Sequence, residues 1–183
     1  MMPEISLNIL DVAQNSISAG SLMTEIEICI DTASDTLEVM IADNGSGMTQ
    51  DQAARVVDPF FTTRTTRKVG LGVPFLKMAA EFAGGSYSME SEPGKGTKIS
   101  AVFGLRHIDR MPLGDMAGTM ISMIGSNPDL DFIFRYSVDK NSFIMDTREI
   151  RQVLEGIPLC EPEVLNYISE YINENIDAVG VRF

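Results

Sequence analysis

The sequence predicts an α/β fold, a two-layer sandwich in which helices cover one face of a mixed, mostly antiparallel sheet. Residues 24–31 and 36–42 alternate apolar and polar side chains, the pattern of strands with one buried face, and a turn at 34–35 joins them. Segments 86–91 and 97–103 predict a second strand pair. Helical patterns precede each pair, so the helices are expected to form their own layer.

The first helix is expected over residues 3–18, because Pro3 suits the first turn of a helix and Gly20 suits its end. An apolar stripe predicts the buried face of this helix: Ile5, Ile9, Val12, Ala13 and Ile17. A polar stripe recurs at the same helical spacing: Asn8, Asp11, Asn15 and Ser18. This second stripe is either a solvated face or one side of a binding site.

Two further helices are expected before residue 104. Residues 49–57 begin with Thr49 and Gln52 at the spacing of a capping box, and Asp58-Pro59 ends the helix. Residues 74–83 form the other helix, closed by Gly84-Gly85. The residues between the two helices show no periodicity, which predicts a loop.

Residues 105–183 predict a C-terminal α+β extension, because the segment is too apolar and too regularly patterned for disorder. Its methionines between 111 and 123 either fill core gaps or form an adaptable contact surface. The extension could fold alone or pack on residues 1–104. Its expected elements are a helix at 113–124, a hairpin of strands 132–137 and 142–146, a helix from its cap Asp146 to Leu154, and a last helix at 162–176.

Composition and charge exclude several function classes. The chain has 183 residues with 26 acidic and 14 basic side chains, shared evenly between its two halves, so bulk charge does not favour nucleic acid. Cys29 and Cys160 lie far apart without zinc-site spacing, and Cys29 is expected to be a buried free thiol. The first residues carry neither a basic stretch nor a long apolar run. We therefore expect a cytoplasmic protein that does not enter a membrane.

The most informative motif is the run Asp43-Asn44-Gly45-Ser46-Gly47-Met48 at the end of a strand. Its carboxylate can accept a hydrogen bond from an exocyclic amine, and its glycines permit positive φ and close approach of a flat ligand. Downstream, Gly70-Leu71-Gly72-Val73 opens a helix whose free N–H groups can bind phosphate oxygens. The run Asp11-Val12-Ala13-Gln14-Asn15-Ser16 precedes both motifs, and Glu90-Ser91-Glu92-Pro93-Gly94-Lys95-Gly96-Thr97 follows them.

These segments, in this order, resemble the ATP-binding domain of DNA gyrase B, the heat-shock chaperone of that class, sensor histidine kinases and MutL, the GHKL or Bergerat-fold superfamily. The resemblance covers residues 1–104 and implies binding of ATP with Mg²⁺. It implies that Asn15 ligates the metal, that Asp43 takes the adenine amine, and that Gly45 and Gly47 shape the pocket floor. Met48 either packs against the base or belongs to the core.

The resemblance also implies a phosphate-binding segment, Gly70, Leu71, Gly72 and Val73, with Lys77 either near the phosphates or solvated. Thr97 matches a threonine near the pocket, although an ordinary strand threonine fits as well. Arg64, which follows a Phe60-Phe61 pair, belongs with Arg67 and Lys68 either to an ATP lid or to a solvated loop. MutL has a glutamate where this chain has Asp11, which implies a general base, with support of the magnesium site as the alternative.

Three functions follow from this resemblance. The first is a stand-alone ATPase that hydrolyses ATP slowly and uses it as a conformational switch on a partner protein. The second is a protein kinase acting in trans on a His or Ser of a separate phosphoacceptor, and the third is a nucleotide sensor without hydrolysis. His107, the one histidine, is not expected to be phosphorylated, because it follows a strand and not a helix. Residues 105–183 are expected to be a regulatory or partner-binding extension outside the ATP pocket.

Overall fold

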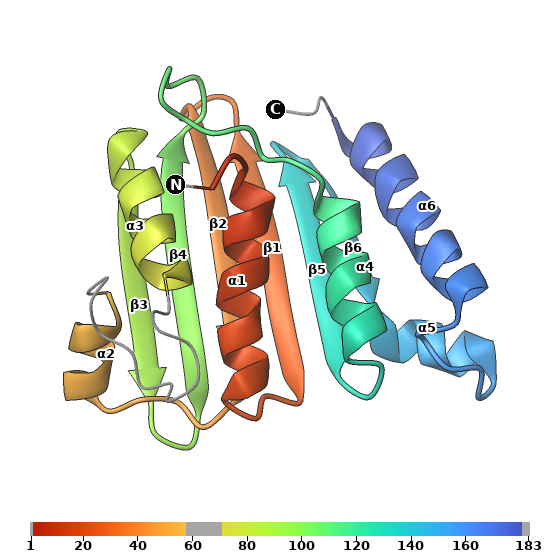
Figure 1. The fold of residues 1–183 in the computed structure, drawn as a ribbon. Coiled ribbons are helices and arrows are strands. Elements are labelled where there is room, and N and C mark those ends of the chain that lie inside the picture. Colours follow the sequence, from red (N-terminus) through yellow and green to blue (C-terminus); the bar gives the residue numbers. More distant parts are fainter. Residues whose placement is uncertain (1, 58–70, 181–183) are drawn as a thin grey trace.

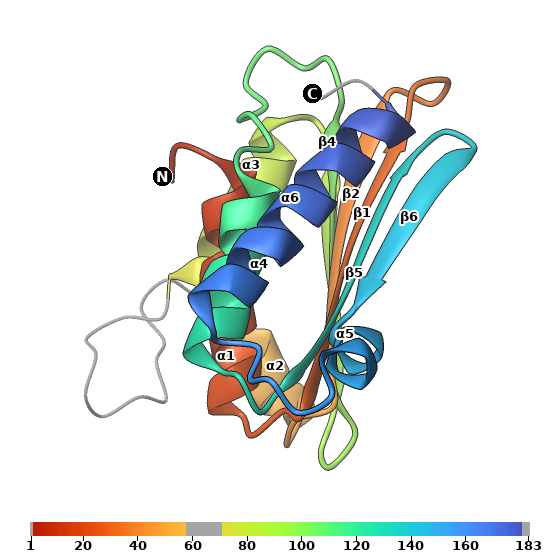
Figure 2. The same cartoon turned by 90° about the vertical axis from the view of Figure 1, so that its right-hand side faces the viewer.

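A computed structural model describes residues 2–57 and 71–180. The strands form one sheet in the order β3-β4-β2-β1-β5-β6, and α1, α3, α4 and α6 cover one of its faces (Figures 1 and 2). The strands are β1 Met23–Asp31, β2 Thr36–Asp43, β3 Ser86–Glu92, β4 Gly96–Gly104, β5 Asp131–Val138 and β6 Asn141–Asp146. The helices are α1 Ile5–Ser18, α2 Gln50–Val56, α3 Gly72–Phe82, α4 Met116–Ser126, α5 Thr147–Leu154 and α6 Pro162–Val179.

The alternating pattern of β1 and β2 places one face of each strand under the helices, as predicted. Ile28 of β1 lies opposite Val39 of β2 in an antiparallel register, and both side chains are fully buried. The other face of the sheet carries the polar members of the alternation, including Glu25 and Glu27. Cys29 lies on that second face and is half-buried, so the expectation of a buried thiol is wrong. Successive side chains of a strand point to opposite faces of the sheet, and Cys29 directly follows the buried Ile28.

The ends of the helices follow local chemistry. The predicted capping box of α2 is present: the Gln52 amide N–H donates to Thr49 Oγ1 at 3.3 Å, and the Thr49 N–H donates to Gln52 Oε1 at 2.9 Å. Helix α1 begins at Ile5 and not at residue 3. Its first backbone N–H groups donate to carbonyl oxygens more than 100 residues further along the chain. Ile5 N donates to Pro112 O at 3.0 Å, and Ser6 N donates to Leu113 O at 2.8 Å. The start of α1 is therefore fixed by the segment that follows β4.

The C-terminal extension adds two strands to the same sheet. Strand β5 pairs with β1 in parallel, with Phe134 opposite Ile26, whereas all other neighbouring strands are antiparallel. Phe132, Phe134 and Tyr136 of β5 are buried in the core that α1 and α4 share. The extension is thus ordered and packs on residues 1–104, while the division at Gly104 stays a prediction about where the functional parts separate.

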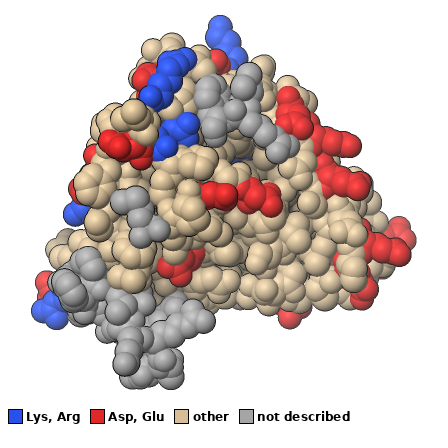
Figure 3. Space-filling view, turned by 45° about the horizontal axis from the view of Figure 1, so that its top comes forward, with Lys and Arg blue, Asp and Glu red and all other residues tan. Residues whose placement is uncertain are grey.

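The methionines of α4 belong to the core. Met116, Met120 and Met123 are buried, so between the two alternatives the gap-filling use applies to them. Within the described part of the chain, no helix is long and apolar enough to cross a bilayer. In Figure 3 acidic side chains gather along the right-hand edge, the side on which α6 lies, in keeping with the net charge of −12.

Candidate nucleotide site

Three segments predicted to form the site meet at one end of the sheet, the lower end in Figure 1: the end of α1, the loop after β2 and the β3–β4 turn. The loop is fixed on both sides by backbone hydrogen bonds. Ser46 N donates to Ala19 O at 2.9 Å, at the end of α1, and Gly94 N of the turn donates to Ser46 O at 2.7 Å. The 43–48 run is therefore held between a helix end and a hairpin.

Asp43 is held by two hydrogen bonds of different origin. Its Oδ1 accepts from the backbone N–H of Gly45 at 2.8 Å, and its Oδ2 accepts from Ser16 Oγ at 2.7 Å. A carboxylate oxygen has lone pairs for more than one donor, so both oxygens can still accept from a ligand amine. Sequence reasoning missed Ser16 as a site residue. Its signal was its place directly after Asn15, inside the first motif.

The glycines of the loop are required by close approach of protein backbone. Gly47 has a φ of +62°, the left-handed region. A Cβ at this residue would overlap the carbonyl oxygen of Glu92 and would lie 3.0 Å from the Gly96 oxygen. A Cβ at Gly45 would lie 2.9 Å from Asp43 Oδ1. Gly47 packs the loop against the β3–β4 hairpin, and Gly45 packs it against Asp43 and against Ala19 at the end of α1. Their role in shaping a ligand floor stays a prediction.

The far end of the loop is tied to β3 and β4 by hydroxyl groups. Met48 N donates to Ser91 Oγ at 2.9 Å, and Ser91 Oγ lies 2.8 Å from Thr97 Oγ1. Thr97 is the residue opposite Asp43 in the β2–β4 register. Thr97 therefore lies beside Asp43 at the end of β2, and its place in a nucleotide pocket stays a prediction. Ser91 is a second residue that sequence reasoning missed, although it lies in the last motif.

Asp11 lies against the beginning of α3. A Cβ on Gly72 would lie 2.7 Å from Asp11 Oδ2 and 3.0 Å from its Cγ, which places the carboxylate on the backbone of the glycine segment. Asp11 and Asn15 are one helical turn apart on α1, so their side chains share a face. The structure thus brings the predicted base to the start of the helix predicted to bind phosphate, with the predicted metal ligand one turn further along α1.

The remaining predicted residues take different positions. Leu71 is the residue before α3, while Val73 is buried in the core. Lys77 is half-exposed, and its Nζ lies 3.9 Å from Glu81 Oε1, one turn further along α3. Arg64 and Gly70 lie outside the described residues, together with the rest of the expected lid.

Asn15 is the group that fits a magnesium ion, because its amide oxygen is a hard, neutral donor. Among residues 2–57 and 71–180, no three His, Cys, Asp or Glu side chains come together as a metal-binding group. An ion held by Asn15 would complete its coordination with phosphate oxygens and water, which is the usual coordination of Mg²⁺ beside a nucleotide.

Comparison with known proteins identifies the family of this chain. Residues 4–107, more than half of the chain, match the family model of the histidine kinase-, DNA gyrase B- and HSP90-like ATPases. The sensor protein kinase FleS of Pseudomonas aeruginosa is 33% identical over 97 residues, which are 53% of this chain and 24% of that protein. The non-motile and phage-resistance protein of Caulobacter vibrioides is 32% identical over 97 residues, 50% of this chain and 12% of that protein.

A solved structure shares the fold. The N-terminal domain of a DNA repair protein superposes with a TM-score of 0.54 at 13% identity, covering 79% of this chain and 53% of that chain. The chain spans less than a quarter of the length of the two relatives, so their activities as whole proteins do not carry over directly. The chain belongs to the histidine kinase-, DNA gyrase B- and HSP90-like ATPase family, whose domain binds ATP.

Proposed function

We propose that this chain, as a member of that family, binds Mg-ATP in the site around Asp43, hydrolyses it slowly and acts as a nucleotide-dependent switch on a partner protein. Asp43, held by Ser16 and Gly45, accepts the adenine amine. The free N–H groups at the start of α3 bind phosphate oxygens. Magnesium, when bound, neutralises part of the phosphate charge, and Asn15 is the residue that would hold it.

The observation that carries the hydrolysis proposal is the position of Asp11. Its carboxylate lies against Gly72, at the segment that would receive the phosphates. A carboxylate in this place can orient a water molecule and take its proton as the water attacks phosphorus. Aspartate is one methylene shorter than glutamate, and its position against the start of α3 supports the proposal that it acts at this segment. Support of the magnesium site by Asp11 remains the alternative role.

Kinase activity in trans is the second candidate, because the relatives include a sensor protein kinase. In this case the phosphoryl group would pass to a His or Ser of a separate protein. His107 is a poor acceptor within the chain. It lies in the turn after β4 and not on a helix, and its Cδ2 would lie 3.2 Å from a Cβ on Gly84, so the imidazole packs against the turn between α3 and β3. A protein partner is favoured over nucleic acid, because the net charge is −12.

Incubation with γ-labelled ATP separates these functions. We expect release of labelled phosphate without label on the chain, and we expect Asp11→Asn to keep ATP affinity while lowering turnover on the order of 10²–10⁴-fold, because shape is kept and basicity is lost. Wild-type turnover in Asp11→Asn would exclude Asp11 as the base. No phosphate release with intact ATP binding would leave a sensor or a kinase, and transfer of label to a second protein would identify the kinase.

A further inference from the structure

Strand β6 is an edge of the sheet that the described part of the chain leaves open. It is the last strand in the order β3-β4-β2-β1-β5-β6, with β5 on one side and no described strand on the other. Figure 2 shows β6 at the margin of the sheet, with α6 on the helix side. The outward backbone groups of an edge strand are available to pair with another chain. Strand β6 therefore has the geometry to accept a further strand.

Strand β6 also lacks the features that usually protect an edge, which are charged side chains, proline or a bulge. Residues 141–145 are Asn-Ser-Phe-Ile-Met, and they pair with β5 without a bulge. The one charged residue, Asp146, is the last, and hydrogen bonds from Arg148 hold the pKa of its carboxyl below the usual range. By contrast, the opposite edge strand β3 carries Glu90 and Glu92 and has α2 beside it.

A row of aromatic rings leads from the core to the surface beside β6. The ring of Phe143, a buried residue of β6, lies edge-on to Tyr171 of α6 with centroids 6.3 Å apart. Tyr171 stacks on Tyr167 with centroids 6.4 Å apart, and Tyr167 is 61% exposed. Leu165 lies about half a helical turn from Tyr167, and its Cδ1 would lie 3.1 Å from a Cβ on Gly125 of α4. The tyrosines are therefore on the side of α6 that faces away from α4.

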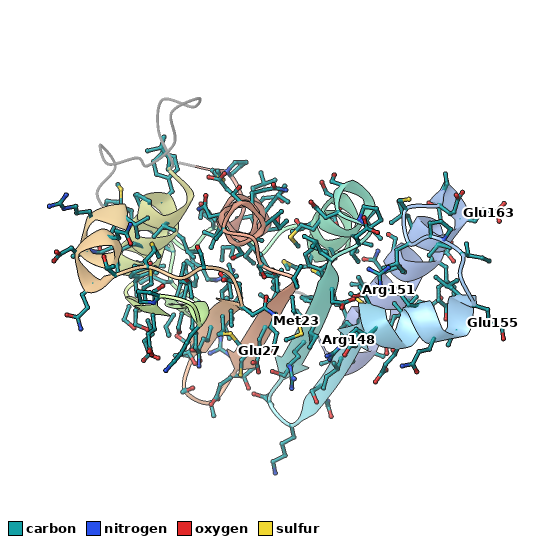
Figure 4. The ribbon with its side chains drawn as sticks, turned by 90° about the horizontal axis from the view of Figure 1, so that it is seen from below. Met23, Glu27, Arg148, Arg151, Glu155 and Glu163 are labelled. Carbon is teal, nitrogen blue, oxygen red and sulfur yellow. The ribbon has the colours of Figure 1, made fainter. Side chains whose placement is uncertain are left out.

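Acidic side chains accompany the two tyrosines along α6. Glu163 and Glu170 lie one helical turn before and after Tyr167, and Glu174 lies one turn after Tyr171. All three glutamates are exposed, and none forms an ion pair with a described residue. Figure 4 shows Glu163 at the outer end of α6, away from the strands. Tyrosine rings and free carboxylates together suit a cationic side chain, arginine above all.

The other face of β6 offers an apolar contact. Phe143 and Met145 are buried on the helix side, so Ile144 between them points to the open face of the sheet, where it is 51% exposed. Successive side chains of an added strand would alternate between these two faces. One set would pass the tyrosines and glutamates of α6, and the other set would lie beside Ile144.

We propose that β6 docks an extended segment of a partner protein as a further strand, with arginines towards Tyr167 and Tyr171 and apolar residues beside Ile144. Main-chain hydrogen bonds to β6 would supply affinity, and the two alternating sets of side chains would supply specificity. The proposal deepens the proposed function, on which it rests only in that it gives the partner of the switch a docking surface and a chemistry.

A second copy of this chain is disfavoured as the occupant. Two copies paired through β6 about a two-fold axis would form one continuous sheet with both helix layers on the same face. Each copy would then bring the acidic row of its own α6 towards that of the other, together with a net charge of −12. Like charges facing each other oppose such pairing.

The test uses the full chain and three labelled peptides, followed by fluorescence anisotropy. The first peptide alternates arginine and valine over about eight residues, enough to span the six residues of β6. The second replaces arginine by glutamate. The third keeps the arginine–valine sequence but has an N-methylated backbone, so it keeps the charge and cannot donate main-chain hydrogen bonds.

Two double variants are compared with the wild type. Ile144→Lys/Tyr167→Ser alters the docking edge, and Ser88→Lys/Phe82→Ser is the matched control at the opposite edge of the sheet. Each variant adds one positive charge on an edge strand and removes one exposed aromatic ring, since Phe82 is 58% exposed and Tyr167 is 61% exposed. All four residues are exposed, so folding should be retained, and circular dichroism checks it.

We expect the arginine peptide to bind the wild type and the control variant equally, and the docking variant at least about tenfold more weakly. The N-methylated peptide should bind the wild type at least about tenfold more weakly than its parent, and the glutamate peptide should not bind. Equal binding of the N-methylated peptide would overturn strand addition, and it does so without any variant. Equal binding to the docking variant, or no binding to the wild type, would also overturn the proposal.

Two further measurements complete the test. Sedimentation that shows a wild-type dimer, lost in the docking variant and kept in the control variant, would overturn the proposal in favour of a second copy. ATP calorimetry separates this proposal from the proposed function, because peptide binding is measured without nucleotide. We expect the same ATP affinity in all three proteins, whereas absence of ATP binding with intact peptide binding would count against the nucleotide site alone.

Discussion

The loop after β2, residues 43–48, is the proposed nucleotide loop, and replacement of its Gly47 by alanine tests whether the loop depends on close contact with the β3–β4 turn. The left-handed conformation of Gly47 costs a residue with a Cβ about 1–2 kcal/mol. The added methyl group would also overlap the Glu92 carbonyl oxygen, so the loop must move. That movement endangers the hydrogen bond from Met48 N to Ser91 Oγ, worth about 0.5–1.5 kcal/mol. Together these terms lower the free energy of unfolding by about 1.5–3.5 kcal/mol.

Gly20→Ala is the matched control, because it separates backbone strain from overlap. Gly20 also has a positive φ, +77°, but a Cβ there would meet no atom within 4 Å. We expect Gly20→Ala to lower the free energy of unfolding by about 1–2 kcal/mol and to keep ATP affinity. Gly47→Ala should lose more stability and at least about tenfold in ATP affinity, or about 1.4 kcal/mol. Urea titration and calorimetry measure both quantities, and equal effects of the two substitutions would refute the overlap argument.

Three further predictions concern the site and the extension. Asp43→Ala should weaken ATP binding by roughly ten- to hundredfold. Ser16→Ala should weaken it by less, roughly two- to tenfold, because Asp43 then loses only one of its two hydrogen bonds. Calorimetry ranks the two variants, and the reverse order would remove the adenine assignment. Asn15→Ala should abolish the magnesium dependence of ATP binding, measured by titration with and without Mg²⁺. A protein ending at Gly104 should lose cooperative thermal unfolding, followed by circular dichroism, because β1 loses β5 and the core loses Phe134.

Local patterns predicted most of the elements because the sheet has one buried and one open face. Period-two alternation survives in β1 and β2 for that reason, with Ile28 inside and Glu27 outside. The capping box at Thr49 and the cap Asp146 were equally local, since each involves residues within three positions. The start of α3 was predicted at Pro74, but α3 begins two residues earlier, at Gly72.

Such local patterns could not predict contacts between residues that are far apart in the sequence. The Ser16–Asp43 hydrogen bond joins residues 27 positions apart, and its donor looks like any serine near a helix end. The contact between Asp11 and Gly72 depends on how α1 and α3 lie side by side, which no periodicity encodes. Local patterns likewise do not say which strand β5 pairs with, and in the structure it pairs in parallel with β1. The apolar run Phe132-Ile133-Phe134 indicated a buried strand without indicating beside which strand it lies.

Strand β1 explains why the extension is part of this fold. The family match ends at residue 107, and within that segment β1 would be the edge of the sheet, paired on one side with β2 only. Its inner face is Ile26, Ile28 and Ile30, all fully buried in the complete chain. An apolar edge strand with free backbone groups invites pairing with other chains. By placing β5 along β1 and α4 beside α1, the extension satisfies those groups and closes the core, so the nucleotide loop is supported by a central strand rather than an edge.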